Sequence, residues 1–273
     1  MMTIVKRTLV AAGLATALVG PALASEGTGP ALHKQSWGWT GIFGGYNHKD
    51  LRHGFEVYRQ VCVTCHPLKH LYYRDLMKIG YSEDEVKEIA GNYEVQDGPN
   101  DDGEMFTRPA TPADRFVAPF ANDKIAAMVN GGAVPPDLSL MTKARKQGPD
   151  YVYNLLHGFA SDAPGEPAAW WLKEREHAGE EPVFPETKYF NDYFPGYAIS
   201  MPPQLHEGIV TYPDGKSPSV DQMAHDVVSF LNWAAEPELE SRKTMGLLTL
   251  LYLGILTTFL YGLKKYIWRD IHH

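Results

Sequence analysis

The sequence predicts a mainly α fold, in which helices joined by long loops form one domain and a last helix crosses a membrane. Helical periodicity is clearest in residues 51–61, where Leu51, Phe55, Tyr58 and Val61 fall on one face. Loops should be plentiful, because the 273 residues include 25 glycines and 20 prolines, a share above the average of about 12% for these two residues. The membrane helix is predicted by residues 245–263, which carry no charge and are rich in leucine.

The first 24 residues have the pattern of a secretory signal peptide. Lys6 and Arg7 form a short basic region, and an apolar run follows from residue 9 to residue 19. Ala22 and Ala24 supply the small residues that a signal peptidase requires at positions −3 and −1. The alternative is an uncleaved anchor, but a run of about eleven residues is too short to span a bilayer. We therefore expect cleavage after Ala24.

The C-terminal stretch 245–263 is predicted to be a transmembrane anchor. As a helix it would extend about 28 Å, close to the roughly 30 Å of hydrocarbon in a bilayer. Basic and aromatic residues suited to the membrane interface lie at its end, namely Tyr261, Lys264, Lys265, Tyr266, Trp268 and Arg269. The alternative, a buried core helix, is disfavoured because only the short tail 264–273 follows it.

The two chain ends together predict the topology. A cleaved signal leaves the new N-terminus outside, so a single span places the tail on the cytoplasmic side, in agreement with the positive-inside rule. Residues 25–244 then form one exported domain, large enough to bury its own core.

Charge and cysteine usage narrow the function of this domain. Residues 25–244 include 32 acidic and 20 basic residues, with acidic clusters at 83–88 and 97–104. Solubility alone explains such a surface, although it could also steer a basic partner; no nucleic-acid partner is expected. An exported protein can use disulfides freely, yet Cys62 and Cys65 are the only cysteines.

Both cysteines belong to the motif Cys62-Val63-Thr64-Cys65-His66, for which three interpretations compete. A zinc site would need about four ligands, and a second cysteine pair is missing. A thiol–disulfide motif should begin a helix after a strand, whereas a helical pattern precedes Cys62. The third interpretation is attachment of a c-type haem. The two thiols would form thioethers, His66 would be the proximal iron ligand, and the single motif predicts one covalently bound haem c.

An electron-carrying haem needs a second axial ligand, usually Met or His. No arrangement of the histidines selects one of them. Among the methionines, Met128 lies in a predicted helix, 123–130, and is expected in the core, and Met223 opens another predicted helix. Met201 follows an aromatic, proline-bounded segment, 189–203, that could cover and hold a haem ring. The residue pattern favours Met201 without excluding the others.

Taken together, these segments resemble the cytochrome c1 family, the haem subunit of quinol–cytochrome c oxidoreductase (bc1) complexes. The resemblance extends from about Trp37 to the C-terminus. It rests on GIFGGY at 41–46, GFEVY at 54–58, CVTCH at 62–66, NGGAVPPDLS at 130–139, DYVY at 150–153, YFPG at 193–196 with Met201-Pro202, and FLNWAAEP at 230–237.

The resemblance implies the remaining site residues. Met201 would be the second axial ligand, Pro136 would line the haem, and Arg145 and Tyr151 would lie near the propionates. A forked cationic donor such as Arg145 suits two carboxylates. Some bacterial relatives have a second cysteine pair ahead of the methionine; this chain has none, so packing alone must hold that loop.

The resemblance also implies a fold and a function. Helices 49–61 and 220–235 would pack together, with Gly54 allowing a close approach and Tyr58, Phe230 and Trp233 filling the contact. The chain would be an electron carrier without catalytic residues, whose enzyme activity belongs to the complex. It would accept an electron from a Rieske iron–sulfur protein, associate with cytochrome b and membrane lipid, and reduce a cytochrome c. Its domain would lie in the periplasm, anchored in the inner membrane of a bacterium.

Two other functions remain open. One is a membrane-anchored c-type cytochrome of a different respiratory chain. The other is a haemless thiol–disulfide oxidoreductase that uses Cys62 and Cys65.

Overall fold

The computed structural model describes residues 30–270 and confirms the mainly α fold. The predicted signal peptide, 1–24, lies outside the described residues. The α-helices are α1 (His48–Gln60), α2 (Glu83–Gly91), α3 (Asp123–Val129), α4 (Met141–Ala144), α5 (Gly148–His157), α6 (Ala169–His177), α7 (Val220–Ala235) and α8 (Leu239–Ile267). There are also two 3-10 segments, η1 (Cys62–Thr64) and η2 (Tyr73–Ile79). Two antiparallel hairpins are formed by β1 (Glu94–Asp97) with β2 (Phe106–Pro109) and by β3 (Tyr189–Phe190) with β4 (Ala198–Ile199).

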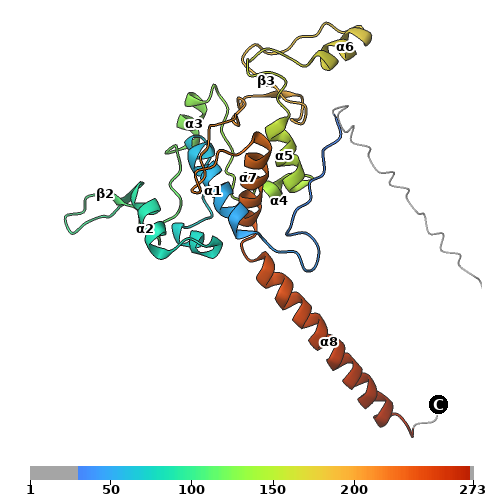
Figure 1. Cartoon of the computed structure of the whole chain (residues 1–273). Coiled ribbons are helices and arrows are strands. Elements are labelled where there is room, and N and C mark those ends of the chain that lie inside the picture. Colours follow the sequence, from blue (N-terminus) through green and yellow to red (C-terminus); the bar gives the residue numbers. More distant parts are fainter. Residues whose placement is uncertain (1–29, 271–273) are drawn as a thin grey trace, which may run out of the picture.

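Helices α1 and α7 cross at the centre of the domain (Figure 1). Their bounds agree with the predicted helices 49–61 and 220–235. Gly54 makes the crossing possible, because a Cβ there would lie 1.9 Å from the backbone oxygen of Asp226. Around this point the Phe230 ring lies 5.6 Å from Phe55 and 5.9 Å from Tyr58. The predicted close approach at Gly54 is therefore confirmed, and Trp233 extends the aromatic contact by stacking on Phe230 at 5.7 Å.

The segment ahead of α1 fastens α5 to this core. Asn154 of α5 accepts a hydrogen bond from the backbone N–H of His33 at 2.9 Å and donates one to its carbonyl at 2.8 Å. The indole of Trp37 donates to Asp150 at 2.7 Å and stacks on Trp39 at 4.8 Å. Helices α4 and α5 in turn pack on α7.

The acidic segment around residues 82–104 forms α2 and the first hairpin. Ser82 and Glu85 form a capping box at the start of α2, where carboxylates also complement the helix dipole. In the hairpin, Arg108 binds Asp97 at 2.5 Å and Asp114 at 2.7 Å. Several of these acids therefore have a local structural role.

Helix α8 begins four residues after α7 ends and extends away from the rest of the protein (Figure 1). The apolar stretch of α8 is not buried against the rest of the protein. Among residues 30–270, α8 is the one helix with the length and composition of a membrane span. The helix is longer than the predicted 245–263 because charged turns extend it at both ends. A core helix is thereby excluded.

We predict that Gly54→Ala lowers the stability of the domain. The added methyl group must push α1 away from α7, and overpacking of this kind costs about 1–3 kcal/mol. Thermal unfolding of the full chain in detergent measures the effect. Gly91→Ala is the matched control, because a Cβ at Gly91 in α2 meets nothing within 4 Å and alanine favours helices. Equal melting temperatures for the two variants would contradict the close contact.

Candidate functional site

The CxxCH motif lies in a tight turn directly after α1. The carbonyl of Cys62 accepts hydrogen bonds from the backbone N–H groups of Cys65 at 3.2 Å and His66 at 2.9 Å. The hydroxyl of Tyr58, buried in α1, donates to the His66 carbonyl at 3.0 Å. The turn is therefore anchored to the α1–α7 core, and it presents two thiols and an imidazole within five residues.

The imidazole of His66 is oriented by Pro136. Its Nδ1 lies 2.8 Å from the Pro136 carbonyl oxygen, which can only accept a hydrogen bond. The proton is accordingly assigned to Nδ1, and Nε2 keeps a free lone pair. Burial lowers the pKa of His66, although the bond to Pro136 acts in the opposite direction. A neutral imidazole with its second nitrogen bound to a carbonyl is the arrangement expected of a metal-ligating histidine.

A series of hydrogen bonds brings Pro136 to this position. The backbone N–H of Leu138 donates to the Pro67 carbonyl at 2.9 Å, and Ser139 accepts from the N–H of His70 at 3.1 Å. Ser139 is fully buried. Sequence reasoning connected Pro136 to the haem only through the family resemblance; the pairing of residues 67–70 with 137–139 carries no local sequence signal.

The environment of Cys62 argues against thiol–disulfide chemistry. Burial raises the pKa of its thiol to about 12, whereas an attacking cysteine needs a lowered pKa. Cys62 also follows the C-terminal end of α1 and begins only the short 3-10 segment η1, not an α-helix. Both cysteines are free and half-buried.

The methionines differ in their surroundings. Met223 is fully buried in α7, and Met141 packs against the core. Met128 was expected in the core, and this prediction was wrong: its side chain is 78% exposed on α3, because the short α3 turns that side away from its one buried residue, Ala126. Met201 is half-buried and lies outside the core cluster, two residues beyond β4.

The loop that carries Met201 is held differently from the expectation. Phe190 is 1% exposed and packs on Tyr197 at 5.5 Å and on Trp171 of α6 at 6.0 Å. This ring therefore helps to hold the loop by packing against the tryptophans of α6. Asn191, which sequence reasoning missed, is fully buried; its side chain donates to the Leu155 carbonyl at 2.8 Å and accepts the N–H groups of two following residues.

Arg145 and Tyr151 lie at the junction of α4 and α5. Arg145 follows the last residue of α4 and is exposed, and Tyr151 is half-buried in α5. Burial raises the pKa of Tyr151, while the positive charge of Arg145 acts in the opposite direction. The structure thus brings these two predicted residues close enough to interact electrostatically.

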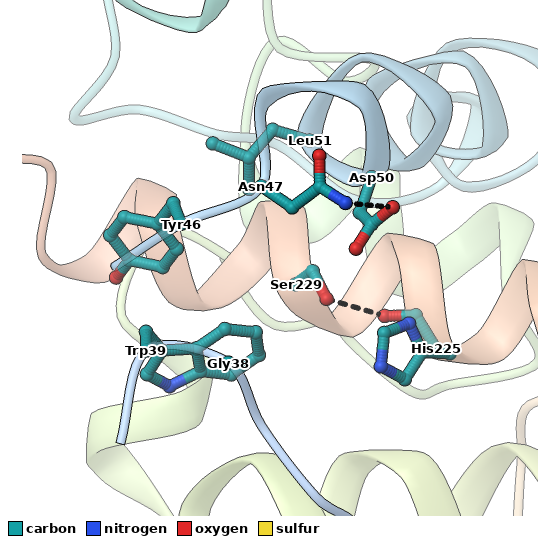
Figure 2. A pocket seen from close by; sticks show the side chains of 8 residues that line it. All are labelled: Gly38, Trp39, Tyr46, Asn47, Asp50, Leu51, His225 and Ser229. Atoms are coloured by element: carbon teal, nitrogen blue, oxygen red, sulfur yellow. Dashed lines mark hydrogen bonds between the residues drawn. The ribbon is translucent and has the colours of Figure 1, made fainter. Parts of the chain in front are cut away.

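A second polar cluster lies at the start of α1, where Asp50, His225 and Asp226 approach one another. Figure 2 shows Asp50 and His225 of this cluster. The adjoining cavity of about 30 Å³ has room for little more than one water. Buried Asp226 already accepts hydrogen bonds from Tyr212 and Gln222, each at 2.7 Å. This cluster therefore joins α1 to α7 and is not a candidate ligand site.

Known proteins are similar to this chain over nearly its whole length. Residues 37–271 match the model of the Cytochrome C1 family. The chain is 59% identical to a cytochrome c1 of Rhodospirillum rubrum over the full length of both proteins. It is 46% identical to a mitochondrial cytochrome c1 haem protein of Arabidopsis thaliana, over 84% of this chain and 70% of the relative. It is also 41% identical to a protein named cytochrome b/c1 of Bradyrhizobium diazoefficiens, over 97% of this chain but only 39% of that protein.

Proposed function

The chain belongs to the cytochrome c1 family, and from this premise we propose that it is the electron-transfer subunit of a bc1 complex, passing single electrons through one covalently bound haem c. The observation that carries the proposal is the turn at residues 62–66 with the Nδ1 of His66 bound to the Pro136 carbonyl. Family membership supplies the haem subunit, and this turn supplies a place for the haem in this chain.

The residues of the site fit a c-type haem. Cys62 and Cys65 would form the thioether bonds, and the unprotonated Nε2 of His66 is available as one axial ligand. Met201 would be the other axial ligand, as the family resemblance implies, and its side chain lies outside the buried core. When bound, the haem supplies one-electron redox chemistry at its iron.

The protein contributes position and electrostatics. Pro136 would line the haem, and its carbonyl fixes the plane of the imidazole. A hydrogen bond to the second nitrogen of a ligating histidine would also influence the potential of the iron. Arg145 and Tyr151 would lie near the propionates, where a guanidinium can offset two carboxylate charges. No bond of a substrate is broken in this chain, and enzymatic activity belongs to the complex.

The membrane arrangement follows from the chain ends. Residues 1–24 would be removed, residues 25–244 would lie in the periplasm, residues 245–263 would cross the inner membrane within α8, and the tail 264–273 would be cytoplasmic. The unburied apolar surface of α8 supports this anchor.

The partners follow from the family. Cytochrome b and a Rieske iron–sulfur subunit would oxidise the quinol, the Rieske protein would donate the electron, and a soluble or anchored cytochrome c would accept it. The relative named cytochrome b/c1 supports the association with cytochrome b.

The first prediction is spectroscopic and compositional. The membrane-extracted protein should give the pyridine haemochrome spectrum of haem c, with one haem per chain, and should co-purify in mild detergent with cytochrome b and a Rieske protein. Co-purification with copper or haem–copper subunits would favour an anchored cytochrome of another respiratory chain. A colourless chain with reactive thiols would favour the oxidoreductase.

The second prediction concerns the axial ligand. Met201→His should lower the haem potential by on the order of a few tenths of a volt, because axial ligand identity is a main determinant of that potential. Turnover should stop while the haem remains attached, as measured by redox titration and haem staining of denatured protein. Met128→His is the matched control, and its potential should stay at the wild-type value. An unchanged potential in Met201→His would show that another residue is the ligand.

The third prediction concerns the acidic surface. Electron transfer to a basic cytochrome c should slow several-fold between low and high salt, since screening shortens the Debye length from about 10 Å at 0.1 M to about 3 Å at 1 M. Stopped-flow rates with a basic and an uncharged acceptor measure the difference. A rate to the basic acceptor that does not depend on salt would assign the acidic residues to solubility and to the local bonds of α2 and its hairpin.

A further inference from the structure

A tight turn ahead of α1 exposes two large apolar side chains. Ile42 is 70% exposed, and Phe43 is 88% exposed, the highest value among the large apolar side chains of residues 30–270. Residues 41–46, here the 41–46 loop, lie between the buried Trp39 and the start of α1. Adjacent exposed residues of this size indicate contact with something apolar.

Charged side chains of α8 hold the 41–46 loop in place. Lys243 donates to the carbonyls of Trp39 at 2.6 Å and Gly44 at 2.9 Å. The N–H of Tyr46 donates to Glu240 at 2.6 Å. The uncharged stretch of α8 begins at Met245, only about 3 Å along the helix axis from Lys243. The loop is therefore fixed to the turn of α8 from which the predicted membrane span starts.

Figure 1 shows the same placement, since the blue segment ahead of α1 turns at the level where α8 begins. The direction of α8 makes this the lower edge of the domain in that view, and α2 reaches the same edge.

The backbone of the loop suits a position next to lipid. An unpaired carbonyl is costly in an apolar medium, and Lys243 satisfies two of the carbonyls here. The loop is also closed on itself, because a Cβ at Gly44 would lie 2.0 Å from the Thr40 carbonyl oxygen. Ile42 and Phe43 thus lie in a compact turn in which α8 binds the Gly44 carbonyl and the Tyr46 N–H.

We propose that the 41–46 loop is a second membrane contact, with Ile42 and Phe43 inserted at the boundary between headgroups and acyl chains beside α8. The contact takes the apolar part of the lipid, because Ile42 and Phe43 carry no charge and Lys243 of α8 is already bound to the carbonyls of Trp39 and Gly44. The inference rests on the proposed function in one respect, that α8 spans the membrane. Two contacts would fix the orientation of the domain toward the bilayer, which one helix alone cannot do.

The test uses labelled variants of the full chain, assembled in its complex and reconstituted in phosphatidylcholine vesicles. Phe43→Cys and, as a second position in the loop, Ile42→Cys carry an environment-sensitive fluorophore. Val183→Cys, at a residue that is 78% exposed, is the aqueous control, and Leu253→Cys in α8 is the membrane control. Lipids with a nitroxide near the headgroup and iodide in the water are the two quenchers.

We expect the lipid nitroxide to quench labels 42 and 43 at least threefold more than label 183, and iodide to quench them at least threefold less. Iodide quenching equal to that of label 183 would place the loop in water and overturn the proposal. Protection from both quenchers would mean that a protein subunit covers the loop, which also overturns it. Failure of the nitroxide lipids to quench label 253 would instead contradict the membrane span of the proposed function.

Discussion

The rest of the structure depends on the crossing of α1 and α7 at Gly54. Backbone atoms of Asp226 and the Cβ of Phe230 occupy the space that any larger side chain would need, so the two helices approach as closely as their main chains allow. Each helix then leads to one functional end of the protein. The CxxCH turn follows α1, and the membrane helix α8 follows α7. The distance between the proposed haem and the bilayer is therefore set by this one contact.

A buried carboxylate reinforces the crossing. Asp226 is fully buried one helical turn from Phe230, and besides Tyr212 and Gln222 it faces two histidines, with the Nδ1 of His53 at 3.5 Å and that of His225 at 3.4 Å. Asp226 raises the pKa of His225, which favours the charged imidazole beside it. A buried charge is costly unless it is fully bonded. The partners of Asp226 come from α1, from α7 and from the segment between β4 and α7, so they can all reach it in only one arrangement of these three parts. Polar bonding thus specifies an arrangement that apolar packing alone would leave looser.

The sequence predicted the elements whose signal is local and missed those that depend on distant partners. The periodicity of Leu51, Phe55 and Tyr58 predicted α1, and the uncharged stretch 245–263 predicted the α8 span, because each pattern lies within one helix. The orientation of His66 could not be predicted from spacing, since its partner Pro136 is 70 positions away and arrives through hydrogen bonds of residues 137–139. The burial of Phe190 against Trp171 could not be predicted either, because the two rings belong to different segments of the chain, the loop 189–203 and α6.

The joint between α7 and α8 has a consequence for motion. Glu236 closes it by binding Arg242 of α8 at 2.6 Å and Lys143 of α4, while the hydroxyl of Tyr46 lies between Asn232 and Glu236. With α8 continuing almost directly from α7, the domain has no tether on which to swing. Under the proposed relay the domain is the fixed component, and its redox centre stays at one distance from the membrane. The changes of distance that control electron transfer must then come from the movement of its partner proteins.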